Sequence, residues 1–169
     1  RRRRDGRMTM AALAQAPDAA SSPFRLDDER AWRDWRARKL GGYPAGVADL
    51  VVEVGDPRAL TRAEHAAIAA RCRIANMVIY ASARLEADKA QPRALAAQFG
   101  LSRLDRNWLA DDDGISRVTV AEGGAGRGEF IPYTHHRIRW HTDGYYNPPE
   151  RRIFAMTLHC VRQADEGGE

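Results

Sequence analysis

The sequence predicts a mixed α+β fold, and three features support this prediction. Thr61-Arg62-Ala63-Glu64 is a capping-box pattern, and apolar residues follow it at helical spacing as far as Ile74. The run Leu50–Val54 is rich in β-branched residues, which is typical of a strand. Apolar and polar residues alternate over residues 115–120 and 153–161, as in strands that are buried on one side.

Length and composition indicate a soluble globular domain. The 169 residues suffice for one hydrophobic core, and 44% apolar with 30% charged residues is typical of this class. The net charge of +4 depends on the run Arg1–Arg4, and no basic stripe interleaved with aromatic residues predicts nucleic-acid binding. No run approaches the ~18 apolar residues of a membrane span. Two distant cysteines, Cys72 and Cys160, do not suggest a disulfide framework, so a reducing, cytoplasmic setting is expected.

The first part of the chain divides into a tail and a helix. Residues 1–22 are predicted to be a disordered tail, because their apolar stretch is too short and too rich in alanine for a signal peptide. Residues 23–169 are expected to form the domain. Its first helix should begin at the carboxylates of Asp27-Asp28-Glu29 and end at Gly41-Gly42.

Two further elements are predicted before the glycine-rich and histidine-rich part of the chain. Met77–Tyr80 has the composition of a buried strand, and Pro92–Phe99 that of a helix closed by a glycine. Cys72, on the apolar side of the helix after Thr61, is expected to be buried packing. The acidic run Asp111–Asp113 is expected to be a solvated turn, because neighbouring carboxylates on a loop point apart.

The alternation over residues 153–161 separates two faces. The wholly apolar face is expected to be core and contains Phe154, Met156, Leu158 and Cys160. The other face is small and polar enough to line a cofactor cavity. His159 on that face is therefore a candidate cofactor-binding residue, with a purely structural histidine as the alternative.

A His-x-Asp pair, His141 and Asp143, is the main candidate for chemistry. In an extended chain, residues two apart point to the same side, so the imidazole and the carboxylate would converge. They would form two-thirds of the 2-His-1-carboxylate set that holds non-haem Fe(II) and leaves positions open for a cosubstrate and O2. A pair of this kind also arises by chance, so the specificity of the motif depends on the residues around it.

These neighbours extend the motif in both directions. Trp140 precedes His141-Thr142-Asp143. After this segment come Tyr145-Tyr146-Asn147-Pro148-Pro149, an apolar run and Gly167-Gly168-Glu169. This order, over about residues 131–169, resembles the TauD/TfdA family of Fe(II)- and 2-oxoglutarate-dependent dioxygenases. The resemblance implies that His141 and Asp143 bind Fe(II), with 2-oxoglutarate and O2 as cosubstrates, and that a small organic substrate is hydroxylated. Tyr145, Tyr146 and Asn147 are then candidate substrate-binding residues.

The resemblance also implies a fold and an incompleteness. The family fold is a double-stranded β-helix, or jelly-roll, braced by N-terminal helices. Its third iron ligand, a His, and the Arg that pairs with 2-oxoglutarate lie downstream of the Gly-Gly-acid turn, where this chain ends. The chain is therefore expected to be the N-terminal portion of such an enzyme and inactive alone. Unpaired edges of a half barrel favour aggregation or a partner, including a homo-oligomer.

Two other interpretations stay open. In the first, the chain is a non-catalytic α+β binding domain in which His141 and Asp143 only form hydrogen bonds. In the second, it is a structural zinc-binding module that adds His135 or His136 to this pair. The two adjacent histidines would point to opposite faces of a strand, so they are not expected to bind one ion together.

Overall fold

The computed structural model describes residues 22–84, 86–105, 109–121 and 126–165. These residues form a mixed α/β structure with three helices and a two-stranded parallel sheet, divided into two compact units at residues 1–84 and 85–169. The predicted disordered tail, apart from Ser22, lies outside the described residues. None of the helices in the described ranges has the length and apolar character to cross a membrane. The helices and strands are α1 (Glu29–Gly41), β1 (Val51–Glu53), α2 (Arg62–Ala75), β2 (Ile79–Ala81) and α3 (Ala90–Ala97).

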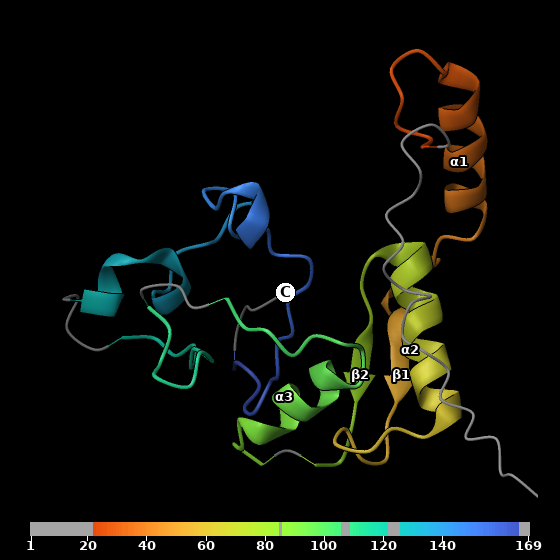
Figure 1. The fold of residues 1–169 in the computed structure, drawn as a ribbon. Coiled ribbons are helices and arrows are strands. Elements are labelled where there is room, and N and C mark those ends of the chain that lie inside the picture. The colour runs from red at the N-terminus through yellow and green to blue at the C-terminus, as the bar shows by residue number, and fades with distance from the viewer. Residues whose placement is uncertain (1–21, 85, 106–108, 122–125, 166–169) are drawn as a thin grey trace, which may run out of the picture. The chain divides into compact units, whose positions relative to one another are not determined.

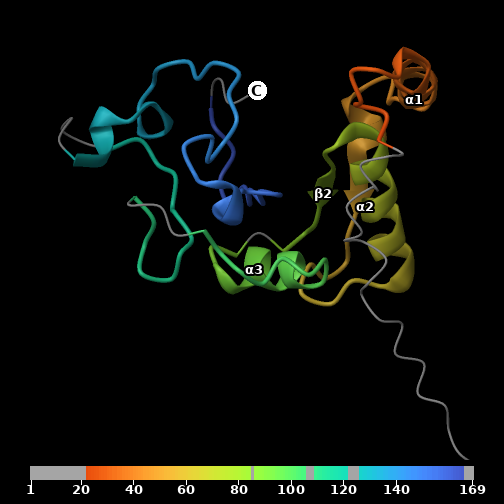
Figure 2. The ribbon, with the colours of Figure 1, turned by 45° about the horizontal axis from the view of Figure 1, so that its top comes forward.

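The first unit is built on β1, α2 and β2. The two strands run parallel, with Val52 opposite Tyr80, and α2 connects them and lies alongside (Figures 1 and 2). Parallel strands need such a crossover, which a helix commonly supplies. The core of this unit lies between the sheet and α2, where the buried apolar side chains are Val52, Val54, Ile68 and Ala75.

The N-terminus of α2 confirms the capping box predicted from the sequence. The backbone N–H of Glu64 donates to Thr61 Oγ1 over 3.2 Å, and the N–H of Thr61 donates to Glu64 Oε2 over 2.6 Å. The other oxygen of Glu64 accepts from the N–H of Gly55 at 2.8 Å, so the same carboxylate also fixes the chain just after β1. Hydrogen bonding with the Thr61 side chain, followed by the bonds from the N–H groups of Gly55 and Thr61, lowers the pKa of Glu64 below its usual value.

The first helix, α1, also follows its prediction. Asp28 is its N-cap and accepts from the N–H of Ala31 at 2.9 Å. Near its other end, Lys39 donates to the carbonyl of Arg73 and to Asn76 Oδ1, each at 2.9 Å. This lysine therefore satisfies polar groups at the C-terminus of α2 and ties the two helices together.

The prediction that Cys72 is buried was wrong, because its side chain is exposed. On α2 the buried face is centred on Ile68 and Ala75. Arg71 lies at the edge of this face and is half-buried. Arg71 donates from Nε to the carbonyl of Asp49 at 2.9 Å. The aliphatic part of the Arg71 side chain thus packs at the edge of the buried face of α2. The sequence pattern had predicted Cys72 for that role.

In the second unit, an ion-pair network joins the start of α3 to the acidic run. Lys89 Nζ donates to Asp111 Oδ2 at 2.6 Å, to Asp113 Oδ1 at 3.1 Å and to the carbonyl of Ile115 at 2.7 Å. Arg127 pairs with the other oxygen of Asp111. The run was predicted to be a solvated turn, but two of its three carboxylates are ion-paired and partly buried.

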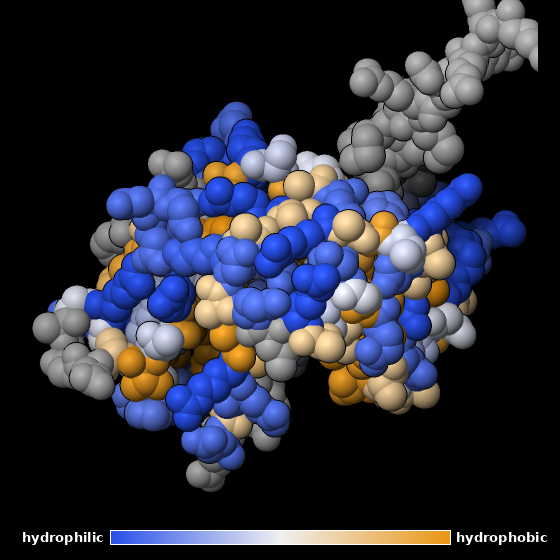
Figure 3. All heavy atoms as spheres, turned by 90° about the horizontal axis from the view of Figure 1, so that it is seen from below, coloured by the Kyte–Doolittle hydropathy of each residue, from blue (hydrophilic) through white to orange (hydrophobic). Residues whose placement is uncertain are grey.

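Neither of the strands predicted for this unit is formed. Residues 115–120 and 153–161 belong to no sheet, although the N–H of Ala121 donates to the carbonyl of Tyr133 at 2.9 Å. The predicted core face is exposed instead: Phe154 is 81% and Leu158 71% accessible. Alternation fixes which side chains share a face, but a strand also needs a partner for its hydrogen bonds. Apolar side chains at the molecular surface, orange in Figure 3, lie among hydrophilic ones.

Short 3₁₀ helices complete the described structure. They span Val47–Leu50, Gly126–Glu129, Ile131–Tyr133 and Pro149–Arg151. The helix at Ile131–Tyr133 buries the Tyr133 side chain, over whose ring the Arg127 guanidinium lies at 5.5 Å. The helix at Pro149–Arg151 ends the loop that follows the His-x-Asp pair.

Candidate metal site

The side chains of His141 and Asp143 converge, as the sequence predicts. Nε2 of His141 lies 3.8 Å from Oδ1 of Asp143, and both side chains are about half exposed. This distance is too long for a hydrogen bond. Two ligand atoms that each lie about 2.1 Å from one ion can be up to ~4.2 Å apart, so both atoms can reach the same metal.

The reason for this convergence differs from the prediction. The pair was expected on an extended strand, but His141 and Thr142 lie on irregular chain, and Asp143 begins a turn over residues 143–146. The N–H of Asn147 donates to the carbonyl of Gly144 at 2.9 Å and closes the turn Gly144–Asn147, which directly follows Asp143. The carboxylate is therefore positioned by a turn and not by the alternation of a strand.

The tautomer of His141 suits metal binding. Its Nδ1 lies 2.7 Å from the carbonyl oxygen of Arg139, which can only accept, so Nδ1 carries the proton. The lone pair of the imidazole is then on Nε2, the atom that faces Asp143. Metal-binding histidines are commonly oriented by such a bond from the other ring nitrogen to a backbone carbonyl.

Gly144 allows the turn to pass close to its neighbours. Its φ of +65° belongs to the left-handed region, and a Cβ there would lie 2.6 Å from Cδ1 of Ile153 and 2.9 Å from Nδ2 of Asn147. Both the backbone conformation and the space thus require glycine directly after the candidate ligand Asp143.

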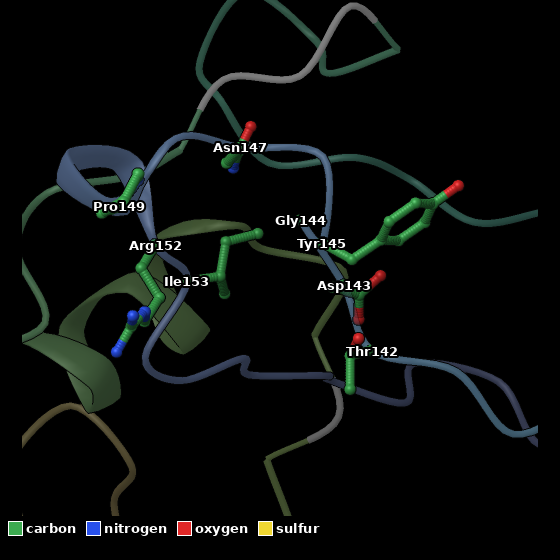
Figure 4. A pocket seen from close by; sticks show the side chains of 8 residues that line it. All are labelled: Thr142, Asp143, Gly144, Tyr145, Asn147, Pro149, Arg152 and Ile153. Atoms are coloured by element: carbon green, nitrogen blue, oxygen red, sulfur yellow. The ribbon is translucent and has the colours of Figure 1, made fainter.

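A cavity of about 350 Å³ adjoins the carboxylate. In Figure 4, Asp143 and Thr142 lie on one side of it and Arg152 and Pro149 on the other, with Ile153 between them. The volume is large enough for a small organic molecule. The lining residues are Thr142, Asp143, Gly144, Tyr145, Asn147, Pro149, Arg152 and Ile153.

Of the four other predicted site residues, two line the cavity and two do not. Tyr145 and Asn147 line the cavity, whereas Tyr146 is not among the lining residues and packs edge-to-face on Tyr145 with ring centroids 5.3 Å apart. His159 is half-buried and is not a lining residue either. The structure therefore brings Tyr145 and Asn147, but not Tyr146 or His159, to the cavity beside Asp143.

Three residues that sequence reasoning did not connect form a cluster beside this cavity. Asp105 accepts from Nη2 of Arg151 at 2.6 Å and from Nδ2 of Asn147 at 3.2 Å. Nδ2 of Asn147 also donates to the carbonyl of Arg151 at 3.1 Å. The amide of Asn147 is thus engaged through its nitrogen, which leaves its carbonyl oxygen as the group that can contact a ligand. No short-range pattern links Asp105 to residues more than forty positions later.

A complete metal site is not assembled by the described residues. Among them, no group of three or more His, Cys, Asp or Glu side chains is arranged to hold an ion. His135 and His136, the additional ligands of the zinc hypothesis, are both exposed and do not complete such a group. Among the described residues, His141 and Asp143 therefore stand as a pair and not as part of a larger group of this kind.

Comparisons with family models, with curated proteins and with solved structures find no match for this chain. The resemblance to the TauD/TfdA family accordingly depends on the sequence pattern over about residues 131–169.

Proposed function

We propose that this chain carries the first two iron ligands of an Fe(II)- and 2-oxoglutarate-dependent dioxygenase that hydroxylates a small organic substrate. The observation that supports it most is the approach of His141 Nε2 to within 3.8 Å of Asp143 Oδ1, with Nδ1 of the same imidazole held by a backbone carbonyl. An imidazole nitrogen and a carboxylate oxygen are the donor types of two of the three ligands in the Fe(II)-binding facial set.

Each residue has a defined part in this proposal. The bond from His141 Nδ1 to the carbonyl of Arg139 keeps the lone pair on Nε2 and fixes the ring orientation. Asp143 supplies a negative oxygen that offsets part of the charge of a divalent ion. Because both side chains are about half exposed, an ion between them would keep positions free for other ligands. Bound Fe(II), 2-oxoglutarate and O2 would together supply the oxidising power to hydroxylate a C–H bond.

The cavity is the proposed place for the substrate. Tyr145 lines its edge, and the carbonyl oxygen of Asn147 would serve as an acceptor for the substrate. In the same proposal, the third iron ligand and the arginine for 2-oxoglutarate are contributed from outside these 169 residues. The finer fold prediction, an incomplete jelly-roll, belongs to the proposal as well.

Anaerobic addition of Fe(II) and 2-oxoglutarate tests the proposal. We expect one Fe(II) per chain at His141 and Asp143, little 2-oxoglutarate consumption by residues 1–169 alone, and a weak visible charge-transfer band once the missing ligands are present. Stoichiometric Zn²⁺ binding that raises stability without a response to Fe(II) would instead support the zinc module. Absence of binding by either metal would support the non-catalytic domain.

A further inference from the structure

One carboxylate holds the loop that follows the candidate ligands at two points. Asp105 Oδ1 accepts from Arg151 Nη2 at 2.6 Å, and Asp105 Oδ2 accepts from Asn147 Nδ2 at 3.2 Å. We call Asp105, Asn147 and Arg151 the loop clamp. Its hydrogen bonds join residues 42 and 46 positions apart in the chain.

The loop clamp reaches Asp143 through a short series of contacts. The side chain of Asn147 donates to the carbonyl of Arg151 at 3.1 Å, and its backbone N–H donates to the carbonyl of Gly144 at 2.9 Å. Gly144 directly follows Asp143. The position of the carboxylate thus depends on a turn whose last residue is held by Asp105.

The loop clamp contains an ion pair between a partly enclosed carboxylate and a half-exposed guanidinium. The Asp105 side chain is 24% exposed and that of Arg151 54%, so the carboxylate is the more enclosed partner. Charge-assisted hydrogen bonds of this kind are shorter and stronger than neutral ones. The bond from Arg151, followed by that from Asn147, lowers the pKa of Asp105 below its ordinary value.

We propose that Asp105 is a positioning residue of the candidate metal site, which fixes the loop over residues 144–151 and thereby the place of Asp143 opposite His141. This inference rests on the proposed function, because it treats the pair as metal ligands. It adds a residue that touches neither metal nor substrate.

The test compares Asp105→Asn, which removes the charge at nearly constant shape, with the charge swap Asp105→Arg/Arg151→Asp. Asp111→Asn is the matched control, since Asp111 is also ion-paired in this unit but lies in the Lys89 network. The first readout is the apparent Mn²⁺ affinity, measured from the broadening of His141 ring-proton NMR signals. The second is hydrogen exchange of the Asn147 backbone amide.

We expect Asp105→Asn to weaken Mn²⁺ binding about tenfold and Asp111→Asn to bind as the wild type does. The charge swap should stay weakened, because an arginine at position 105 restores the ion pair but cannot accept from Asn147 Nδ2. Faster exchange at Asn147 should accompany the weaker binding. An Asp105→Asn variant with faster exchange but unchanged affinity would overturn the positioning role. If the wild type shows no broadening at His141, the proposed function fails. The clamp is then judged by exchange alone, and an unchanged rate in Asp105→Asn would refute it.

Discussion

The substitution Gly144→Ala tests the turn that carries Asp143. Two effects add in this variant. An L-residue in the left-handed region, at φ +65°, loses about 1–2 kcal/mol. The new Cβ would also lie 2.6 Å from Cδ1 of Ile153 and 2.9 Å from Nδ2 of Asn147, and overpacking of this kind costs about 1–3 kcal/mol. The free energy of unfolding of residues 85–169 should therefore fall by about 2–5 kcal/mol.

Gly126→Ala is the matched control for the first of these effects. Gly126 has nearly the same φ, +67°, but nothing within 4 Å of its Cβ position, so only the backbone strain of about 1–2 kcal/mol applies. Urea unfolding followed by the methyl NMR signals of Ile153 and Leu95 reports this unit for both variants. A loss in Gly144→Ala no larger than that in Gly126→Ala would refute the close packing around the turn.

Two further predictions concern the two units separately. Thr61→Ala removes the side-chain acceptor at the start of α2 and should destabilise the first unit by about 1 kcal/mol in urea unfolding, while Thr61→Ser should be close to neutral. In the second unit, hydrogen bonds from Lys89 and Arg127 lower the pKa of Asp111 to about 2. The folded unit then binds fewer protons than the unfolded chain, so this contribution is present above pH 3.8 and is lost as the pH falls towards 2. Asp111→Asn should flatten the stability profile over that range, whereas Asp112→Asn, outside the network, should leave its shape unchanged.

Features with a local cause were predictable from the sequence. The capping box of Thr61 and Glu64 depends on residues three positions apart, and the structure forms both of its hydrogen bonds. The same holds for Asp28 as the N-cap of α1. The strand pair β1 and β2 was predicted as two strands, but their parallel pairing depends on the packing of α2 and was not.

Features with distant partners were not predictable. The alternation over residues 153–161 contains no information on a pairing strand, and no strand is formed there. The sequence reveals the cluster of negative charge at Asp111–Asp113 but not its ion-pair partners. The lysine and the arginine that pair with Asp111 lie 22 and 16 positions away from it. The loop clamp of Asp105 is similarly non-local. At the candidate site, the sequence indicated the pair His141 and Asp143, and the turn that positions it appeared only in the structure.

The most direct test of the proposed metal site is site-resolved paramagnetic broadening. Mn²⁺ titrated into the 169-residue chain should broaden the ring protons of His141 at substoichiometric amounts and leave those of His135 and His136 sharp. Asp143→Ala should abolish this selectivity, because one of the two ligands is removed. Equal broadening of all three histidines, or broadening of His141 that survives in Asp143→Ala, would contradict a shared ion between the imidazole and the carboxylate.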